Sequence, residues 1–392
     1  MRKSVICPHC KSENTSKNGG HKPSNTQKIF CRDCGKHFRA RYRNNAYKAG
    51  TIRKIDQLTD RGVSVRETAK KLKISTKTVW THRKALSQAY HERISQPFRV
   101  PAVDLYVIAF SGGKDSSALL VWALEHLPQD QLRFVFCDTG WESPITYQFI
   151  DEVNHRLLDG RLIVLKSRKY TDLLDLAKKK RRFPSPKARF CTEELKIVPM
   201  IEWILQQSCD IAVYQGIRAE ESEARRRMKP SDEFFKPQID YDQNPHRFVD
   251  GQWKRKQAPI FQKQAIAWLE SYECSVERPF FYWKTKDILT LCRKHNVLNP
   301  LYSKGFSRVG CFPCIMANKR EIRRIAEIDP ERITTIAQAE QETGHSFFPY
   351  SKVPDAQCEK PAIHDVVKWA FSNVTMTEQD TPSCLSHYAQ CE

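Results

Sequence analysis

Four cysteines near the amino terminus stand in two Cys-x-x-Cys pairs. Cys7 and Cys10 form the first pair, and Cys31 and Cys34 form the second. The stretch between the pairs is too hydrophilic to form a core of its own. Two pairs of thiolates give the closed tetrahedral site that structural zinc prefers, and the metal would supply the missing folding energy. The spacing predicts a zinc ribbon over residues 1–45, with a cluster of metal-free thiols as the alternative.

A second group of reactive residues is Ser111-Gly112-Gly113-Lys114-Asp115-Ser116, which follows an apolar run. The glycines allow a tight turn that exposes backbone N–H groups, while a helix N-terminus and Lys114 add positive charge. This pattern predicts a phosphate-binding loop rather than a plain polar turn. It is not a Walker A loop, which needs Gly where Ile108 stands and Ser or Thr where Asp115 stands.

A third group begins at Gly216 and reads Gly-Ile-Arg-Ala-Glu-Glu-Ser, so that it contains Arg218 and Glu221 and is followed by Arg225. It comes directly after an expected strand, and open α/β sheets bind ligands beyond the carboxyl ends of their parallel strands. Arg218 is suited to bidentate contact with a phosphate or carboxylate, and Arg225 is placed to assist. A salt-bridged helix start is the alternative.

The remaining cysteines are candidates for metal binding or catalysis. The chain has 14 Cys, and we expect it to be cytoplasmic, where thiols stay reduced and a chain of this size needs no disulfides. Cys311 and Cys314 form a third Cys-x-x-Cys pair, and Cys191 stands alone upstream. A second zinc site at Cys311 and Cys314 is one interpretation.

Alternating strands and helices must position these groups. We expect strands at 105–110, 132–137, 162–165 and 211–214, and helices at 114–126, 145–158 and 193–207. This alternation predicts an α/β fold, with a parallel sheet that is covered on both faces. We assign this domain to residues 97–330, with an irregular stretch at 230–264, and assign residues 331–392 to a helical extension.

Residues 46–96 show the pattern of a helix-turn-helix. Two short amphipathic helices precede a third that starts after Ser75, a plausible N-cap, and turns Val79 and Trp80 inward. We predict that the outward side chains of this recognition helix bind DNA, namely Lys77, Thr81, His82, Arg83 and Lys84. An ordinary three-helix packing unit is the alternative.

Charge is strongly segregated along the chain. The net charge is +20, and residues 1–100 hold 24 Lys or Arg against 6 Asp or Glu. Such asymmetry is typical of a polyanion-binding module joined to a nearly neutral body, although it also serves solubility. The apolar runs are far shorter than the roughly 20 residues that a membrane span needs, so we expect no membrane partner.

The loop at residues 111–116 resembles the signature of the PP-loop superfamily, also called adenine nucleotide alpha hydrolase-like. That resemblance implies an enzyme that cleaves ATP, with Mg²⁺, between the α and β phosphates. It implies catalytic roles for Lys114, Asp115 and Arg218. The implied ATP-binding residues are Ser111, Gly112, Gly113, Lys114, Asp115, Ser116, Asp138, Gly216, Arg218, Glu221 and Arg225.

The segments around Arg218, Cys191 and Cys311 resemble the branch that is similar to phosphoadenosine phosphosulfate (PAPS) reductase, above all the sulfur-transfer ATP pyrophosphatases of bacterial DNA phosphorothioation. In those relatives four thiolates hold a 4Fe-4S cluster. The resemblance implies Cys191, Cys311 and Cys314 as ligands here. Cys292 is our choice for the fourth, because it precedes the Cys-x-x-Cys pair by a similar interval.

The first quarter of the chain resembles the DNA-binding region of insertion-element transposases, most closely at residues 30–38. Together the resemblances predict an ATP pyrophosphatase and adenylating sulfurtransferase that acts on nucleic acid, with DNA as the expected partner and a cysteine desulfurase as the sulfur donor.

Three other functions stay open. A sulfonucleotide reductase would use Cys384, near His387, or Cys391 as nucleophile and thioredoxin as reductant, although Thr192 stands where cluster-bearing reductases have a second cysteine. The others are a DNA-binding regulator that senses nucleotide or redox state, and a tRNA-thiolating enzyme.

Overall fold

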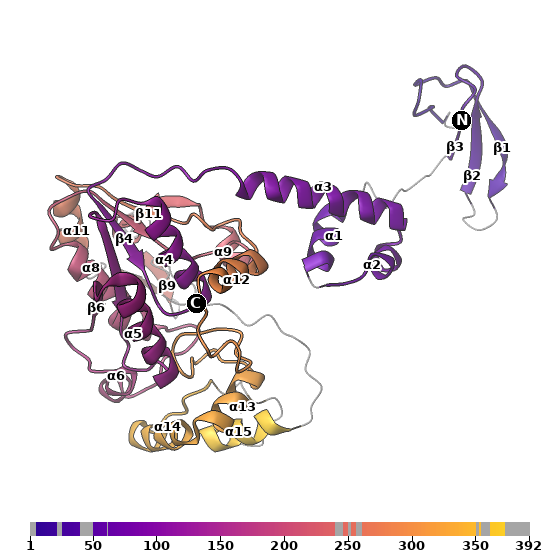
Figure 1. The fold of residues 1–392 in the computed structure, drawn as a ribbon. Coiled ribbons are helices and arrows are strands. Elements are labelled where there is room, and N and C mark those ends of the chain that lie inside the picture. Colours follow the sequence, from indigo (N-terminus) through magenta and orange to yellow (C-terminus); the bar gives the residue numbers. More distant parts are fainter. Residues whose placement is uncertain are drawn as a thin grey trace. The chain divides into compact units, whose positions relative to one another are not determined.

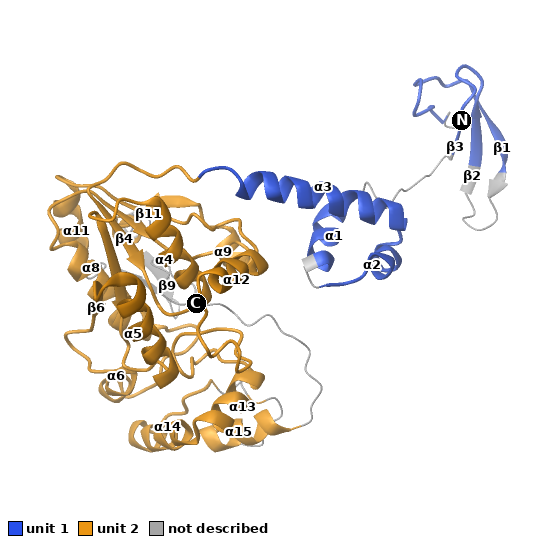
Figure 2. Cartoon of the chain, viewed as in Figure 1, with its two compact units in different colours: residues 1–97 blue, residues 98–392 orange. Residues whose placement is uncertain are grey.

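The computed structural model divides into two compact units, residues 1–97 and residues 98–392 (Figures 1 and 2). The structure describes residues 5–21, 26–39, 50–60, 62–239, 246–249, 252–255, 261–349, 353 and 361–372. Within these ranges, no helix is both long enough and apolar enough to cross a membrane.

The first part of unit 1 is a small antiparallel sheet of β1 (Thr15–His21), β2 (Thr26–Cys31) and β3 (His37–Arg39). Each Cys-x-x-Cys pair lies in a tight turn, where the Lys11 N–H donates to the Cys7 carbonyl at 2.9 Å and the Gly35 N–H donates to the Cys31 carbonyl at 3.0 Å. Lys11 and Gly35 both have positive φ angles, 62° and 67°. The two turns therefore have the same knuckle geometry.

The second part of unit 1 contains α1 (Thr51–Asp60), α2 (Val65–Leu72) and α3 (Thr76–Ile94). The Ser75 side chain caps α3 by accepting from the Thr78 N–H, as the sequence indicates. The three helices meet in a core of Ile55, Ala69 and Val79.

Unit 2 is built on a sheet with the strand order β6-β5-β4-β7-β11-β8 in the described residues. Its strands are β4 (Leu105–Ala109), β5 (Leu132–Cys137), β6 (Leu162–Leu165), β7 (Ile211–Tyr214), β8 (Ser231–Glu233) and β11 (Cys274–Glu277). All pairings are parallel except β11 with β8. The predicted α/β class with a parallel sheet is confirmed, and β8 and β11 extend it at one edge.

Helices cover both faces of this sheet (Figure 1). One face packs against α4 (Lys114–His126), α5 (Pro144–Leu158) and α12 (Thr285–Lys294). The other face packs against α8 (Val198–Ile204) and α11 (Gln262–Leu269). The stretch 230–264, predicted to be irregular, contains α10 (Lys236–Ile239) and the antiparallel pair β9 (His246–Val249) and β10 (Gln252–Arg255). The short helix α9 (Glu223–Arg226) comes just before it.

A further core joins the carboxyl-terminal helices to the body of unit 2. It includes residues of α6 (Leu173–Lys180), α13 (Lys319–Ile328), α14 (Pro330–Thr343) and α15 (Ile363–Phe371). Residues from the predicted extension, 331–392, thus share a core with residues from the predicted catalytic domain.

The segment that carries Cys191 is a continuous helical stretch of α7 (Phe190–Thr192), the π-helical η2 (Glu193–Ile197) and α8. Single π-helical turns are rare and occur frequently at functional sites.

Candidate phosphate site and cysteine sites

The loop at residues 111–116 joins β4 to α4 and has the form of a phosphate cradle. The Ser116 Oγ hydrogen-bonds the Ser111 hydroxyl at 3.0 Å, accepts from the Ser111 N–H and donates to the Gly113 carbonyl at 3.1 Å. Gly112 has a φ of +77°, and a Cβ added there would lie 3.1 Å from Thr146. The turn therefore needs glycine, and it places the N-terminus of α4 at the carboxyl end of β4, where helix N–H groups attract anions.

Gly216 lets the segment after β7 pass close to this helix terminus. A Cβ at Gly216 would lie 2.7 Å from the backbone carbon of Asp115. The structure thus accounts for Gly216 by the approach of two backbones, which brings Arg218 next to Asp115.

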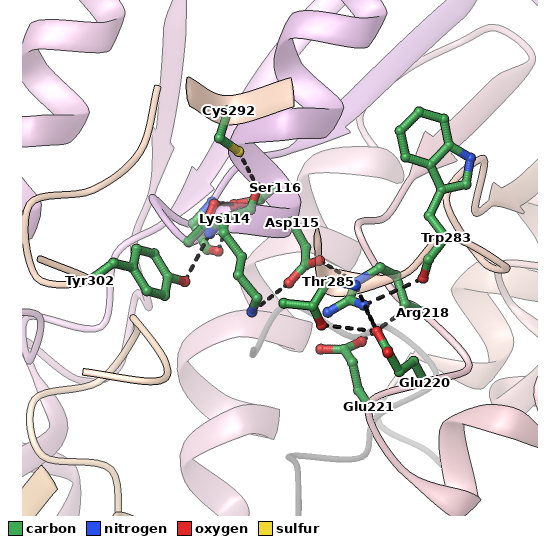
Figure 3. A network of polar contacts seen from close by, with 12 residues as sticks. Lys114, Asp115, Ser116, Arg218, Glu220, Glu221, Trp283, Thr285, Cys292 and Tyr302 are labelled. Atoms are coloured by element: carbon green, nitrogen blue, oxygen red, sulfur yellow. Dashed lines mark hydrogen bonds and ion pairs between the residues drawn. The ribbon is translucent and has the colours of Figure 1, made fainter. Parts of the chain in front are cut away.

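A buried network of alternating charges crosses this junction (Figure 3). The Lys114 ammonium lies 2.8 Å from the Asp115 carboxylate, which also contacts the Arg218 guanidinium. Arg218 donates to Glu220 at 2.6 Å and, through its backbone N–H, to Glu221 at 2.9 Å. Arg225 in turn contacts Glu221, and both arginines are almost fully buried.

Electrostatics favour the ionised forms of Asp115 and Arg218. Burial opposes the charged form of Asp115, but Lys114 and Arg218 outweigh it and lower the pKa of Asp115 from 3.8 to about 2. Burial likewise opposes the charge of Arg218, but Asp115 and Glu221 raise its pKa. In this structure Arg218 is engaged by carboxylates, so its contact with a phosphate stays a prediction.

Asp138 follows β5 and belongs to a second polar cluster that the sequence analysis missed. It accepts from the Tyr147 hydroxyl at 2.6 Å and pairs with Lys166 at 3.1 Å. Tyr147 also donates to the buried Glu142 at 2.9 Å, and Glu142 accepts from the Thr139 hydroxyl at 2.7 Å. Burial opposes ionisation, but the Tyr147 hydrogen bond and the Lys166 charge lower the pKa of Asp138. The only sequence signal was the polar run directly after a strand.

The thiols of Cys7, Cys10, Cys31 and Cys34 form a compact group, with all four sulfur atoms within 4.8 Å of one another. The Cys7 and Cys34 sulfurs are 3.7 Å apart, and those of Cys10 and Cys31 are 3.5 Å apart. A tetrahedron with Zn–S bonds of roughly 2.3 Å has edges of about 3.8 Å. The donor set and its dimensions therefore fit one zinc ion.

The other cysteine group lies in unit 2. Among the described cysteines, Cys191, Cys311 and Cys314 line one cavity, which they share with Arg189 and Lys196. Trp141 fixes the Cys-x-x-Cys turn, because its carbonyl accepts from the Phe312 N–H at 2.7 Å and its indole N–H donates to the Pro313 carbonyl at 3.1 Å.

Cys292 is not part of this group, and our choice of it as fourth ligand is wrong. It lies on α12, is fully buried in the core formed with α4, and donates from its thiol to the Lys114 carbonyl at 3.1 Å. Cys191, Cys311 and Cys314 instead pack against the core that includes residues of α6 and α13. Cys384, His387 and Cys391 lie outside the described residues.

The recognition helix presents a different face from the predicted one. Trp80, expected inside, has 58% of its surface exposed, and the Lys84 ammonium lies 5.5 Å from its ring centroid. Arg83, expected to bind DNA, donates to the Val63 carbonyl at 2.6 Å and to the Thr68 hydroxyl at 3.1 Å.

Of the other predicted contacts, Lys77, Thr81 and Lys84 are exposed and His82 is half-buried. Because residues i, i+3, i+4 and i+7 share one side of a helix, the exposed face comprises Lys77, Trp80, Thr81 and Lys84.

Comparison with known proteins identifies the region that contains both sites of unit 2. Residues 105–317 match the family described as phosphoadenosine phosphosulfate reductase domain. Over 305 residues the chain is 30% identical to an uncharacterized 37.8 kDa protein of Escherichia phage 186, a match that covers 63% of this chain and 80% of the phage protein.

Two further relatives have more specific names. The adenosine 5'-phosphosulfate reductase of Anoxybacillus flavithermus is 25% identical over 191 residues, which cover 47% of this chain and 63% of that protein. The insertion element iso-IS1N protein InsA of Shigella dysenteriae is 35% identical over 75 residues, which cover 19% of this chain and 82% of that protein.

Proposed function

Because this chain belongs to the phosphoadenosine phosphosulfate reductase domain family, we propose that it is an ATP pyrophosphatase that adenylates nucleic acid, most simply DNA, for sulfur transfer. The observation that carries the proposal is the cradle at residues 111–116, whose glycine-dependent turn and helix N-terminus suit a pyrophosphate. Lys114 would supply the adjacent positive charge.

The proposed reaction has two displacements. An oxygen of the nucleic acid attacks the α-phosphorus of ATP, the bond to the bridging oxygen breaks, and pyrophosphate leaves with Mg²⁺ as its counter-ion. A sulfur nucleophile then takes the place of the activated oxygen, and AMP leaves. In this scheme the cradle and Lys114 hold the pyrophosphate, and the ion pairs of Asp115 and Arg218 keep the cradle aligned with the segment after β7.

The cysteine cavity is the proposed site of an iron–sulfur cluster that binds the sulfur species delivered by a cysteine desulfurase. Cys191, Cys311 and Cys314 would hold it, and Arg189 and Lys196 line the same cavity. Among the described residues, only the amino-terminal cysteines bring three or more metal-binding atoms within 4.8 Å of one another. The sulfur atoms of Cys191, Cys311 and Cys314 do not all lie within that distance of one another. This spacing suits a cluster better than a second zinc ion, because the iron and sulfide atoms of a cluster stand between the thiolates.

Unit 1 is proposed to bring this activity to DNA, with one zinc ion in the ribbon. The basic excess of the first hundred residues supports a polyanionic partner, and the exposed face of α3 combines two lysines with an aromatic ring.

A sulfonucleotide reductase is the second candidate function. The named reductase among the relatives favours it. Formation of sulfite from an activated sulfate would identify this activity, whereas the adenylating enzyme would release pyrophosphate from ATP only with nucleic acid as acceptor.

The Lys114→Ala variant tests the main proposal. We expect it to abolish pyrophosphate release from ATP while DNA affinity stays within about twofold of wild type, because the cradle and the basic helix lie in separate units. Lys294→Ala, which removes an exposed lysine of unit 2, is the matched control and should keep both properties. Undiminished pyrophosphate release by Lys114→Ala would contradict the proposed role of the cradle.

A further inference from the structure

A tyrosine distant in sequence touches the phosphate cradle. The backbone N–H of Lys114, the first residue of α4, donates to the hydroxyl oxygen of Tyr302 at 3.0 Å (Figure 3). The Lys114 ammonium lies 5.7 Å from the centroid of the same ring. Tyr302 itself is half-buried.

This contact uses a group that a phosphate would need. The first N–H groups of a helix have no partner within the helix, and phosphates bind at helix N-termini by accepting from them. The Tyr302 oxygen accepts from one of these N–H groups at an ordinary hydrogen-bond distance, as a phosphate oxygen would.

We propose that the Tyr302 hydroxyl holds the place of a phosphate oxygen in the cradle and is displaced when the pyrophosphate part of the nucleotide binds. The proposal rests on the proposed function, since it takes the cradle to be the phosphate site. A phosphate oxygen is the stronger competitor, because hydrogen bonds to ionised acceptors are roughly twice as strong as those between neutral groups.

Displacement of the Tyr302 side chain would leave the attachment of its segment to the cradle in place. The Tyr302 segment is anchored just before it, where the Asn299 side chain donates to the Gly112 carbonyl at 3.2 Å. After Tyr302 the chain turns through Gly305, with a φ of +90°, and reaches Cys311 and Cys314. The residue that yields to phosphate therefore lies on the same segment as two of the proposed cluster ligands.

The test is isothermal titration of pyrophosphate, and separately of ATP with Mg²⁺, into the full chain as wild type and as Tyr302→Phe. Phenylalanine removes the competing hydroxyl and keeps the ring beside Lys114. We expect Kd to fall about 2- to 10-fold, the range that corresponds to one net hydrogen bond. Tyr272→Phe, a half-buried tyrosine on the other face of the sheet, is the control and should leave Kd unchanged.

The outcomes separate the two proposals. If wild type binds and Tyr302→Phe binds equally or more weakly, the displacement is wrong, although the cradle remains a phosphate site. If neither protein binds either ligand, both proposals fail. Tyr302→Leu should lower Kd as well, and it decides the matter if the phenylalanine variant does not fold.

Discussion

The two units of this protein place their charged groups in opposite ways. In the described part of residues 1–97 the buried side chains are few, and Lys77 and Lys84 of the recognition helix face solvent beside an exposed Trp80. In residues 98–392 large cores surround the sheet, and Lys114, Asp115, Arg218 and Arg225 are buried between its strand ends. Basic groups on a surface suit a long polyanion, whereas buried and paired ones suit a small ligand enclosed at a sheet edge.

The two units also differ in the source of their folding free energy. Among the described residues of the ribbon, the buried ones with apolar side chains or thiols are Cys7, Ile29 and Cys31. So small a core needs another source of folding free energy. The sheet of unit 2 buries large apolar cores on both faces. Its buried polar groups can therefore be specialised for a ligand at a cost in stability. The following variants test this contrast, beginning with the largest expected effect.

Cys31→Ser should unfold the ribbon. Structural zinc supplies roughly 10–16 kcal/mol of apparent binding free energy to zinc-finger peptides, and that energy is also folding energy. We expect the variant to purify without zinc and to lose amide protection over residues 5–39, while the melting transition of unit 2 stays in place. Cys209→Ser, in unit 2, is the control. If the amides of the ribbon stayed protected in a zinc-free variant, unit 1 would not depend on metal for its folding, and the contrast with unit 2 would be wrong.

Asp115→Asn should destabilise unit 2 by about 3–5 kcal/mol at neutral pH, because it leaves buried cations without their counter-charge. The pKa of Asp115 is lowered from 3.8 to about 2 in the folded chain. Its stabilising contribution is thus fully present above about pH 4 and is lost as the pH falls through about 2. Denaturant unfolding between pH 7 and pH 2 measures this, with the exposed Asp151→Asn as control. A loss below 1 kcal/mol would mean that the buried network contributes no more than a surface pair.

Sequence patterns among neighbouring residues predicted more of this fold than could be predicted of the contacts between segments that are far apart in the chain. The strands of the parallel sheet, the cradle and the zinc knuckles follow from residues close together in the chain. Trp80 and Arg83 were assigned to the wrong sides of α3, because Arg83 contacts Val63 and Thr68 across a turn whose geometry the pattern does not reveal.

Contacts between distant segments were the main gap. Cys292 was chosen by its interval from Cys311, but α12 packs on α4 and takes Cys292 away from the other thiols. The hydrogen bonds from the Tyr147 hydroxyl to Asp138 and from the Lys114 N–H to Tyr302 could likewise not be predicted, because sequence spacing carries no information on which helix packs on which loop.

Cys314→Ser and Cys292→Ser should differ in iron content rather than in stability. If Cys191, Cys311 and Cys314 hold a 4Fe-4S cluster, anaerobically purified wild type contains about four irons per chain. The Cys314 variant should lose them and keep its zinc, whereas the Cys292 variant should keep both, because its hydroxyl can still donate to the Lys114 carbonyl. Iron lost from the Cys292 variant alone would restore the ligand set that the sequence indicated, and two zinc ions without iron would replace the cluster by a second zinc site.

Lys84→Ala and Arg83→Ala should separate surface charge from buried structure within one helix, with the smallest effects of the series. Lys84 is exposed, so its removal should weaken DNA binding and reduce the slope of log K against log salt by about 0.9, the value for one phosphate contact. Arg83 donates to Val63 and Thr68, so its removal should lower the melting temperature of unit 1 and leave that slope unchanged. Binding titrations at several salt concentrations and thermal melts measure both effects. The reverse assignment, with the slope set by Arg83, would mean that DNA draws the arginine out of its intramolecular bonds, and the surface of unit 1 would then be rearranged by its ligand rather than prepared for it.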